Sequence, residues 1–330
     1  MCGSPDSHAW GKVRRLVAVA GMLALVPAVG MRVEAQRIDY SATLGASRGA
    51  FVFSEPTTSW VFDQGLVFAT ERWRIGANLP VVMQNSSAIS YIAGIPLPTG
   101  GPYSGTLAGR ASGTTIPMRG RQGSGTGTGG VIAADARFAD RALHAVAPPV
   151  ASLVDSGAVE EPGAFATHLG DPVIQAEAEF AMSARGSTRL GVKLLTKLPI
   201  ADAASGVGTG ELDYGAGLTF STATARAFVF GDVSHWVLGD MPDLPLRNLT
   251  SGSLGAGLTF GEMGRVSALA SVSGATALVD NVEAPLAAGL SFGLAVQDRR
   301  FITLGVTIGL SESSPDWGLS IGWRVLLTSR

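Results

Sequence analysis

The sequence GAGLTF occurs twice, at residues 215–220 and 255–260, and a related AGLSF follows at residues 288–292. In each copy, glycine, serine or threonine alternates with alanine, leucine or phenylalanine. Residues two apart lie on the same side of a β-strand but not on the same side of a helix. The motif therefore predicts strands with one apolar face and one face of small side chains. Such strands need an apolar surrounding on one side only.

The same alternation covers most of the C-terminal half of the chain. WGLSIGWRVLL at residues 317–327 places Trp317, Ile321 and Trp323 on one face and Gly318 and Arg324 on the other. Similar runs occur at residues 73–81, 174–182, 190–198, 212–220, 254–260, 266–272 and 302–310. Most approach the roughly 9–11 residues that a tilted strand needs to cross a bilayer. They predict membrane-spanning strands.

Three further strands are predicted on weaker grounds. Residues 60–70 place Gln64 on the apolar face, and residues 225–237 fit either register because aromatic residues oppose valines. We predict both as strands from their length and position. We also expect one early strand around residues 48–55.

The composition is apolar, rich in glycine and poor in charge. The chain has 46% hydrophobic and 15% charged residues, 44 glycines and a mean hydropathy of +0.30. Soluble domains typically carry about 25% charged residues. The formal net charge of −2 offers nucleic acid no electrostatic attraction, so no nucleic-acid partner is expected.

Residues 1–35 have the features of a secretory signal peptide. Basic residues precede an apolar run at 16–30, and residues 33–35 form an A-x-A-like cleavage site. The mature chain would then begin near Gln36; an uncleaved signal anchor is the alternative. The apolar run is short and interrupted by Pro27, so it does not predict a membrane-spanning helix.

The only cysteine, Cys2, lies within the expected signal peptide. A mature chain without thiols excludes disulfides, thiolate metal sites and a cysteine nucleophile. An exported, apolar chain without a spanning helix must satisfy its backbone hydrogen bonds between strands, and in lipid this requires a closed barrel.

The connections between the predicted strands alternate in length. Short links lie at residues 71–72, 185–187, 222–224, 262–264 and 297–299, and longer ones at 201–210, 239–250, 275–282 and 311–315. Outer-membrane barrels have short periplasmic turns and longer outer loops, whereas a soluble β-sandwich mixes loop lengths at both ends. Residues 36–330 are therefore predicted to form an all-β, transmembrane up-and-down antiparallel β-barrel of about 12 strands.

One predicted connection, residues 84–171, is far longer than ordinary loops. It contains the glycine-rich GRQGSGTGTGGV and a short helical pattern at residues 132–146. Strand parity places this insertion on the extracellular side. It could cover the mouth, constrict the lumen or stay partly disordered, and an additional hairpin within it would raise the strand number to about 14.

Two segments carry a resemblance to a known family. GDPVIQAEAEF at residues 170–180 and RLGVKLLTKLPIADAASGVGTGELDYGAGLTF at residues 189–220 resemble outer-membrane proteins associated with the phenol-degradation meta-pathway. The matching features are Gly170-Asp171, Lys197-Leu198-Pro199, the glycines at 208–210, Asp213 and residues 214–218. The resemblance covers residues 170–327 and, more weakly, 65–81. The chain departs from many outer-membrane proteins at its C-terminus, which lacks a terminal aromatic residue.

The resemblance implies an outer-membrane channel or transporter, linked in some members to aromatic or other apolar compounds. The partners expected of such a protein are outer-membrane lipid, small solutes and the barrel-assembly machinery.

Charged residues of the predicted strands fall on the small-residue face. They are Glu177, Glu179, Arg189, Lys193, Lys197, Asp213 and Arg324. A lipid-facing Arg or Lys at mid-bilayer costs about 2–4 kcal/mol, so this face is expected to line the lumen. The strip could select solutes or set the polarity of the pore. Alternatively, it is an ion-paired cluster that fills a narrow barrel and holds its register.

Catalytic and cofactor sites find little support. A barrel hydrolase needs histidine beside a nucleophile, but His235 and its neighbour Ser234 point to opposite faces of one strand. A serine from another strand remains open as a partner. Residues 123–130 lack the Lys-Ser/Thr of a phosphate loop, and Asp240, Asp243 and Glu312 lack metal-ligand spacing. We therefore expect no enzyme activity, cofactor or metal.

The function predicted from the sequence is passive passage of small solutes, apolar or aromatic ones among them, through the lumen. A plugged structural or adhesion-type barrel is the first alternative, and an outer-membrane barrel hydrolase is the second.

Overall fold

The computed structural model describes residues 37–92, 95–100, 164–183, 187–202, 205–241, 244–261, 264–297 and 299–329. The expected signal peptide and the glycine-rich and helical patterns between residues 119 and 146 lie outside these ranges. The described residues contain no helix that is long and apolar enough to cross a membrane.

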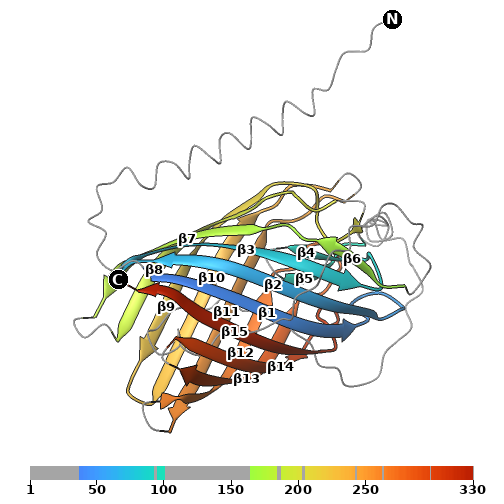
Figure 1. The fold of residues 1–330 in the computed structure, drawn as a ribbon. Coiled ribbons are helices and arrows are strands. Elements are labelled where there is room, and N and C mark those ends of the chain that lie inside the picture. The colour runs from blue at the N-terminus through green and yellow to red at the C-terminus, as the bar shows by residue number, and fades with distance from the viewer. Residues whose placement is uncertain are drawn as a thin grey trace, which may run out of the picture. The chain divides into compact units, whose positions relative to one another are not determined.

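Twelve antiparallel strands form a closed ring (Figure 1). They are β1 (Arg37–Gly49), β2 (Thr57–Ala69), β3 (Trp73–Gln84), β7 (Val173–Met182), β8 (Thr188–Lys197), β9 (Asp213–Ala223), β10 (Ala227–Val237), β11 (Leu249–Phe260), β12 (Val266–Ala275), β13 (Leu286–Gln297), β14 (Arg300–Gly309) and β15 (Trp317–Ser329). The ring closes because β1 pairs with both β2 and β15, and β2 pairs with β3. The predicted 12-stranded antiparallel barrel is confirmed.

Three short strands come from the long insertion. β4 (Ile89–Ile92) and β5 (Ile95–Pro98) form a separate hairpin, and β6 (Ala166–Leu169) pairs with the end of β3 beyond the part that pairs with β7. β6 is therefore an extension of β7, interrupted at residues 170–172. In the described part of the insertion, the hairpin adds no strand to the ring, which excludes it as the source of a 14-stranded barrel.

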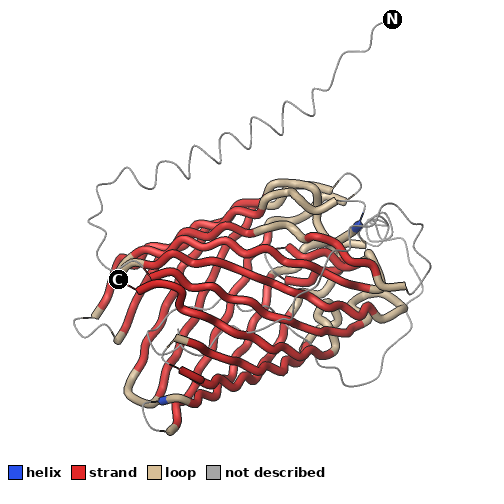
Figure 2. Tube along the Cα trace, in the orientation of Figure 1, coloured by secondary structure: helices blue, strands red, loops and turns tan. Residues whose placement is uncertain are grey.

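The connections divide between the two ends of the barrel as the sequence predicted. The short turns lie at the end where Arg37 of β1 pairs with Ser329 of β15. The longer loops, shown in tan in Figure 2, gather mainly at the other end together with β4 and β5. By the general rule for outer-membrane barrels, the first end is periplasmic and the second is extracellular.

The expected early strand at residues 48–55 was misplaced. β1 ends at Gly49, and most of residues 50–56 form turns and bends that connect it to β2. The outward positions of β1 include Ala42 and Ala46, which contrast little with the glycine and serine of its inner face. The alternation that identifies the other strands is therefore weak in β1.

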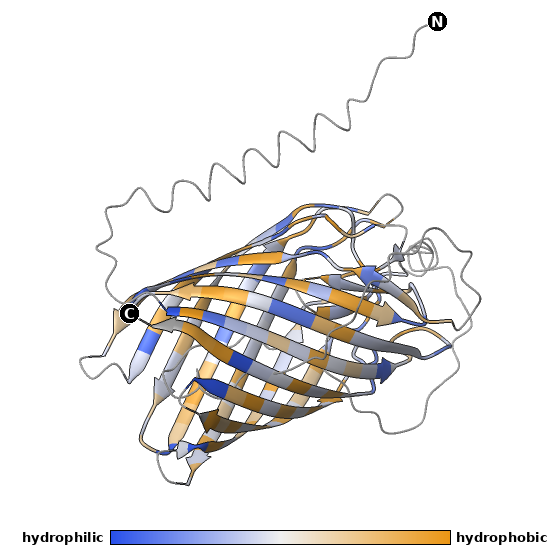
Figure 3. Cartoon of the chain, viewed as in Figure 1, coloured by the Kyte–Doolittle hydropathy of each residue, from blue (hydrophilic) through white to orange (hydrophobic). Residues whose placement is uncertain are grey.

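The exterior of the barrel is apolar. Large hydrophobic side chains alternate outward along the strands, and Leu218 is 55% exposed while Leu319 is 51% exposed. Figure 3 shows these apolar positions as bands along the strands. Gln64 shares the outward side of β2 with Leu66 and Phe68, as its parity predicted. An exterior of this kind is stable only in contact with hydrocarbon.

The structure resolves the register of β10. Phe228, Phe230 and Trp236 are buried and share the inner face, opposite Gly257, Gly255 and Gly215 of the neighbouring strands. A Cβ atom at Gly255 or Gly257 would collide with the ring of Phe230 or Phe228. The glycines of the GAGLTF copies therefore make room for aromatic rings that project from β10.

Candidate functional site

The inner surface of the barrel has two chemically different walls. The small-residue wall consists of the inner faces of β11–β15 and β1, where Gly, Ser, Thr and Ala fill nearly every position. Its few larger inward residues include Leu249, Leu269, Phe301, Arg324 and Asp39. The charged wall consists of the inner faces of β2, β3 and β7–β10 and carries the long, charged and aromatic side chains. Polar and bulky groups are thus concentrated on one half of the circumference.

Four side chains of the charged wall form an ion-pair network near the periplasmic end. Arg74 on β3 lies 3.2 Å from Glu177 and 3.1 Å from Glu179, both on β7. Arg189 on β8 lies 2.7 Å from Glu179. Two positive and two negative charges balance in this cluster, which lowers the cost of burying each of them.

The glycines of the charged wall lie where long side chains cross a strand. Glu177 reaches across β8 and accepts a 2.5 Å hydrogen bond from Thr219 on β9. A Cβ at Gly191, which lies between them, would be 2.9 Å from the Glu177 carboxylate. The inner-face glycines therefore permit ion pairs and hydrogen bonds between strands that are not adjacent.

Lys193 makes a second crossing of this kind. Its ammonium group lies 2.5 Å from Asp232, although β9 separates their strands. Ser253 on β11 donates a 2.5 Å hydrogen bond to the other oxygen of Asp232. A Cβ at Gly217 of the opening motif would be 3.0 Å from the Lys193 side chain. Glycine at this position thus lets the lysine pass over β9.

The third cluster surrounds the fully buried Lys197 at the extracellular end. Its ammonium group lies 2.7 Å from Asp213, 3.1 Å from Asp171 and 2.6 Å from the hydroxyl of Thr209. Asp171 also accepts hydrogen bonds from the backbone N–H groups of residues 200 and 201, and Asp213 accepts one from Gly239. This cluster, the Lys197 latch, fastens the β8–β9 loop to the interrupted strand β6–β7.

Six of the seven predicted site residues therefore lie on the charged wall. Arg324 lies apart from them, on the small-residue wall, where its guanidinium group is 5.2 Å from the centre of the Phe301 ring. Sequence reasoning missed Arg74, Asp171 and Asp232. Strand parity in residues 73–81 could have identified Arg74 as an inward residue, whereas Asp232 was hidden by the ambiguous register of β10.

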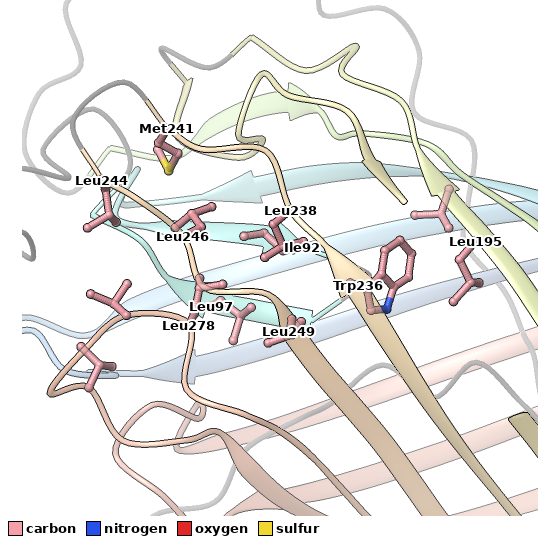
Figure 4. Close-up of a cluster of buried hydrophobic side chains, with 13 residues drawn as sticks. Ile92, Leu97, Leu195, Trp236, Leu238, Met241, Leu244, Leu246, Leu249 and Leu278 are labelled. Carbon is pink, nitrogen blue, oxygen red and sulfur yellow. The ribbon is translucent and has the colours of Figure 1, made fainter. Parts of the chain in front are cut away.

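The described part of the insertion contributes to an apolar cluster at the extracellular mouth. Ile92 and Leu97 of the hairpin pack with Trp236, with loop residues and with the outer ends of β7, β8 and β11 (Figure 4). The other buried members are Val173, Leu195, Leu238, Met241, Leu244, Leu246, Leu249, Leu278, Val279 and Val282. The hairpin thus packs against the loops and strand ends at the mouth.

Hydrogen bonds fix the hairpin to the β8–β9 loop. The backbone N–H of Tyr91 donates to the carbonyl of Val207 at 2.9 Å, and the Ser90 hydroxyl donates to the carbonyl of Gly206 at 2.5 Å. Burial raises the pKa of Tyr91 to about 12, so its hydroxyl stays neutral. Because the Lys197 latch holds the same loop, the hairpin and the charged wall are mechanically connected.

The positions considered for catalysis and metal binding lie apart. His235 is exposed on the outer face of β10 and contacts Thr250 through its Nδ1 atom at 2.9 Å, whereas Ser234 is buried on the inner face. In the part of the chain that the structure describes, no three His, Cys, Asp or Glu side chains form a group that could hold a metal ion. Asp243 lies outside that part.

No protein-family model and no curated protein matches this chain in sequence. Among solved structures, an outer membrane channel from Pseudomonas putida F1 is similar, with a TM-score of 0.53 and 11% identity over 90% of this chain and 97% of that one. The NanC porin has a TM-score of 0.46 at 5% identity, covering 88% and 100% of the two chains. The toluene transporter TodX of P. putida has a TM-score of 0.38 at 11% identity, covering 89% and 90%.

At these identities, the likeness to the P. putida F1 channel shows a shared fold. That fold, the closed ring of strands and the apolar exterior agree with one another. The chain is a β-barrel protein of the bacterial outer membrane.

Proposed function

We propose that this protein is a passive channel for small solutes, apolar or aromatic ones among them, and that it performs no covalent chemistry. The observation that carries the proposal is the small-residue wall. Its inward Ser271, Ser291, Thr307 and Ser320 are partly exposed, although the exterior on either side of them is covered by large apolar side chains. Solvent-accessible surface inside a barrel is what a solute path requires.

The charged wall has a different role in this proposal. Five of the six predicted residues on it are buried, the side chain of Glu179 is 5% exposed, and all six form ion pairs. They therefore hold the wall in shape and set the polarity of the lumen beside the path. Lumen lining by Glu177, Glu179, Arg189, Lys193, Lys197, Asp213 and Arg324 remains part of the proposal. The preference for aromatic solutes comes from the resemblance to the phenol-degradation group.

The mouth cluster favours a second candidate, a plugged barrel without transport. Hairpin β4–β5 packs with the loops at the extracellular end, and its buried side chains are mostly apolar, Ser90 being the polar one. In the channel proposal, the same hairpin restricts entry and selects small solutes. The two functions differ in whether solute passes the hairpin.

Planar-bilayer conductance and liposome uptake of a small neutral aromatic compound test the proposal. The full chain is compared with a variant in which residues 88–99 are replaced by a short glycine-serine linker. Channel function predicts measurable uptake by the full chain and larger conductance in the variant. Conductance in the variant alone would identify a plugged barrel, and absence of current and uptake in both would refute transport.

Three associated predictions complete the proposal. Residues 1–35 direct export and are removed near Gln36, the barrel-assembly machinery inserts the mature chain, and the insertion at 84–171 lies on the extracellular or lumenal side. N-terminal sequencing of the purified outer-membrane protein tests the first of these.

A further inference from the structure

Exposed arginines surround the periplasmic end of the barrel. Arg72 lies in the β2–β3 turn, Arg226 in the β9–β10 turn, Arg265 in the β11–β12 turn, and Arg299 and Arg300 at the β13–β14 turn. We call these five residues the arginine rim. They occupy four of the five short turns, so they are distributed around the circumference rather than gathered in one patch.

The residues that the structure describes offer the rim no ion-pair partner. None of its five guanidinium groups forms an ion pair or a side-chain hydrogen bond with another described residue. Glu71 is the one acidic residue that the structure describes in the short turns. By sequence, the five short turns hold six arginines, the rim and Arg185, against the three acidic residues Glu71, Glu262 and Asp298, which leaves these turns a net charge of +3.

Aromatic side chains mark the edge of the membrane beside the rim. Phe68, Trp73, Phe180, Phe220 and Phe260 are all exposed, and each lies near the periplasmic end of its strand. Aromatic residues are enriched where the hydrocarbon meets the headgroups. Arg72, Arg226 and Arg265 follow Phe68, Phe220 and Phe260 by four to six positions. The rim therefore lies at headgroup height.

The described loops at the opposite end of the barrel carry the opposite charge. The described residues of its longer loops include one basic residue, Arg247, which pairs with Asp280 at 2.8 Å. Their acidic residues are Glu55, Asp202, Glu211, Asp240, Asp280, Glu283, Glu312 and Asp316. Among the described connections, an excess of arginine is thus confined to one end.

We propose that the arginine rim binds the phosphate groups of anionic phospholipids in the periplasmic leaflet. Guanidinium groups form paired, charge-assisted hydrogen bonds with phosphate oxygens. A ring at headgroup height, continuous with the apolar exterior, matches a lipid whose acyl chains lie against the barrel. The interaction anchors the barrel vertically and gives it a shell of anionic lipid.

Native mass spectrometry of the purified full chain in micelles tests this inference, with phosphatidylglycerol and phosphatidylcholine as competing probes. The rim variant carries Arg→Gln at all five positions, and Arg247→Gln is the control at the other end. We expect the wild type and the control to retain phosphatidylglycerol preferentially. The rim variant should lose this preference, by about fivefold in affinity for each guanidinium group that contacts a headgroup.

If the substitution of all five arginines prevents folding, two double variants serve in its place. One carries Arg72→Gln with Arg226→Gln, and the other carries Arg265→Gln with Arg299→Gln. Added salt should weaken the wild-type preference, because exposed charges are screened. Equal retention of both lipids by the wild type, or an unchanged preference in the variants, would refute lipid binding. The latter result would point to another anionic partner. Conductance plays no part in the readout, so the result is independent of the channel proposal.

Discussion

Lys197 and Asp213 lie directly opposite each other on β8 and β9, with the ammonium group 2.7 Å from the carboxylate and both side chains shielded from solvent. The pair closes the base of the β8–β9 loop, and Asp171 joins it from the break between β6 and β7. All three residues belong to the segments that resemble the phenol-degradation group. In this chain, those segments build a loop anchor.

Replacement of Lys197 by Met should destabilise the barrel strongly. The substitution leaves Asp171 and Asp213 buried with no cation between them, and breaking a buried ion pair from one side costs about 3–5 kcal/mol. The measurement is urea unfolding in micelles, followed by heat-modifiable migration on gels. Arg247→Gln, which removes an ion pair with side chains 60% and 65% exposed, should change stability by less than about 1 kcal/mol. Equal effects of the two substitutions would contradict the latch.

Inner-face glycines should differ in their tolerance of a methyl group. Gly255→Ala would press a Cβ against the buried Phe230 ring, and overpacking of this kind costs about 1–3 kcal/mol. At Gly45, a Cβ would meet nothing closer than 3.8 Å, so Gly45→Ala should be neutral or slightly stabilising in unfolding experiments.

A double-mutant cycle separates the ring contact from a general effect of alanine. In a Phe230→Leu background, Gly255→Ala should lose most of its cost, because the colliding ring is absent. The same cost in both backgrounds would show that the ring is not the obstacle.

The network of Arg74, Glu177, Glu179 and Arg189 should influence ion selectivity. Arg74→Gln leaves it with one net negative charge, and Glu177→Gln leaves it with one net positive charge. At high dielectric, a unit charge about 8 Å from a permeating ion changes the free energy of that ion by roughly 0.5 kcal/mol, which is about twofold in its occupancy. Reversal potentials across a salt gradient should therefore shift in opposite directions. Shifts of the same sign, or none in a conducting barrel, would exclude this network as a selectivity element.

Alternation identified most strands because the contrast between the two faces is large. In β13, Leu290 and Phe292 point outward while Gly289 and Ser291 point inward. Parity also placed the charged residues on the inner side. Both inferences need only one strand at a time, so a single sequence contains enough information for them.

Features that depend on neighbouring strands could not be predicted from the sequence. The aromatic residues of β10 fit the interior because glycines on β9 and β11 lie opposite them, and the Lys193–Asp232 pair spans three strands. Each strand of hairpin β4–β5 has only four residues, and two of the four in β5 are prolines. The hairpin therefore gives no alternation signal. Its position depends on tertiary contacts with the loops.

His235 should be dispensable for any activity of the barrel. Its imidazole is exposed on the outer face and separated by the sheet from the buried Ser234 hydroxyl. His235→Ala should leave conductance unchanged, and wild type and variant should show the same background release of fatty acid from phospholipid vesicles. Lipid hydrolysis by the wild type that disappears in His235→Ala would restore the hydrolase alternative.

Neighbouring cysteines on β14 should report on opposite surroundings. Thr307 belongs to the small-residue wall and pairs with Gly289 and Gly318, while Ile308 is 41% exposed on the exterior. With Cys2 replaced by Ser, Thr307→Cys should react with a membrane-impermeant maleimide added in water, because the proposed solute path is wet. Ile308→Cys should resist that reagent, and a fluorophore attached to it in detergent should be quenched by brominated lipid after reconstitution. Because the two residues are adjacent, differences in depth or strand stability cannot produce this contrast.

If position 308 reacted from water while a label at 307 contacted lipid, the inward assignment of the glycine, serine and threonine face would be wrong, and the proposed path would be wrong with it.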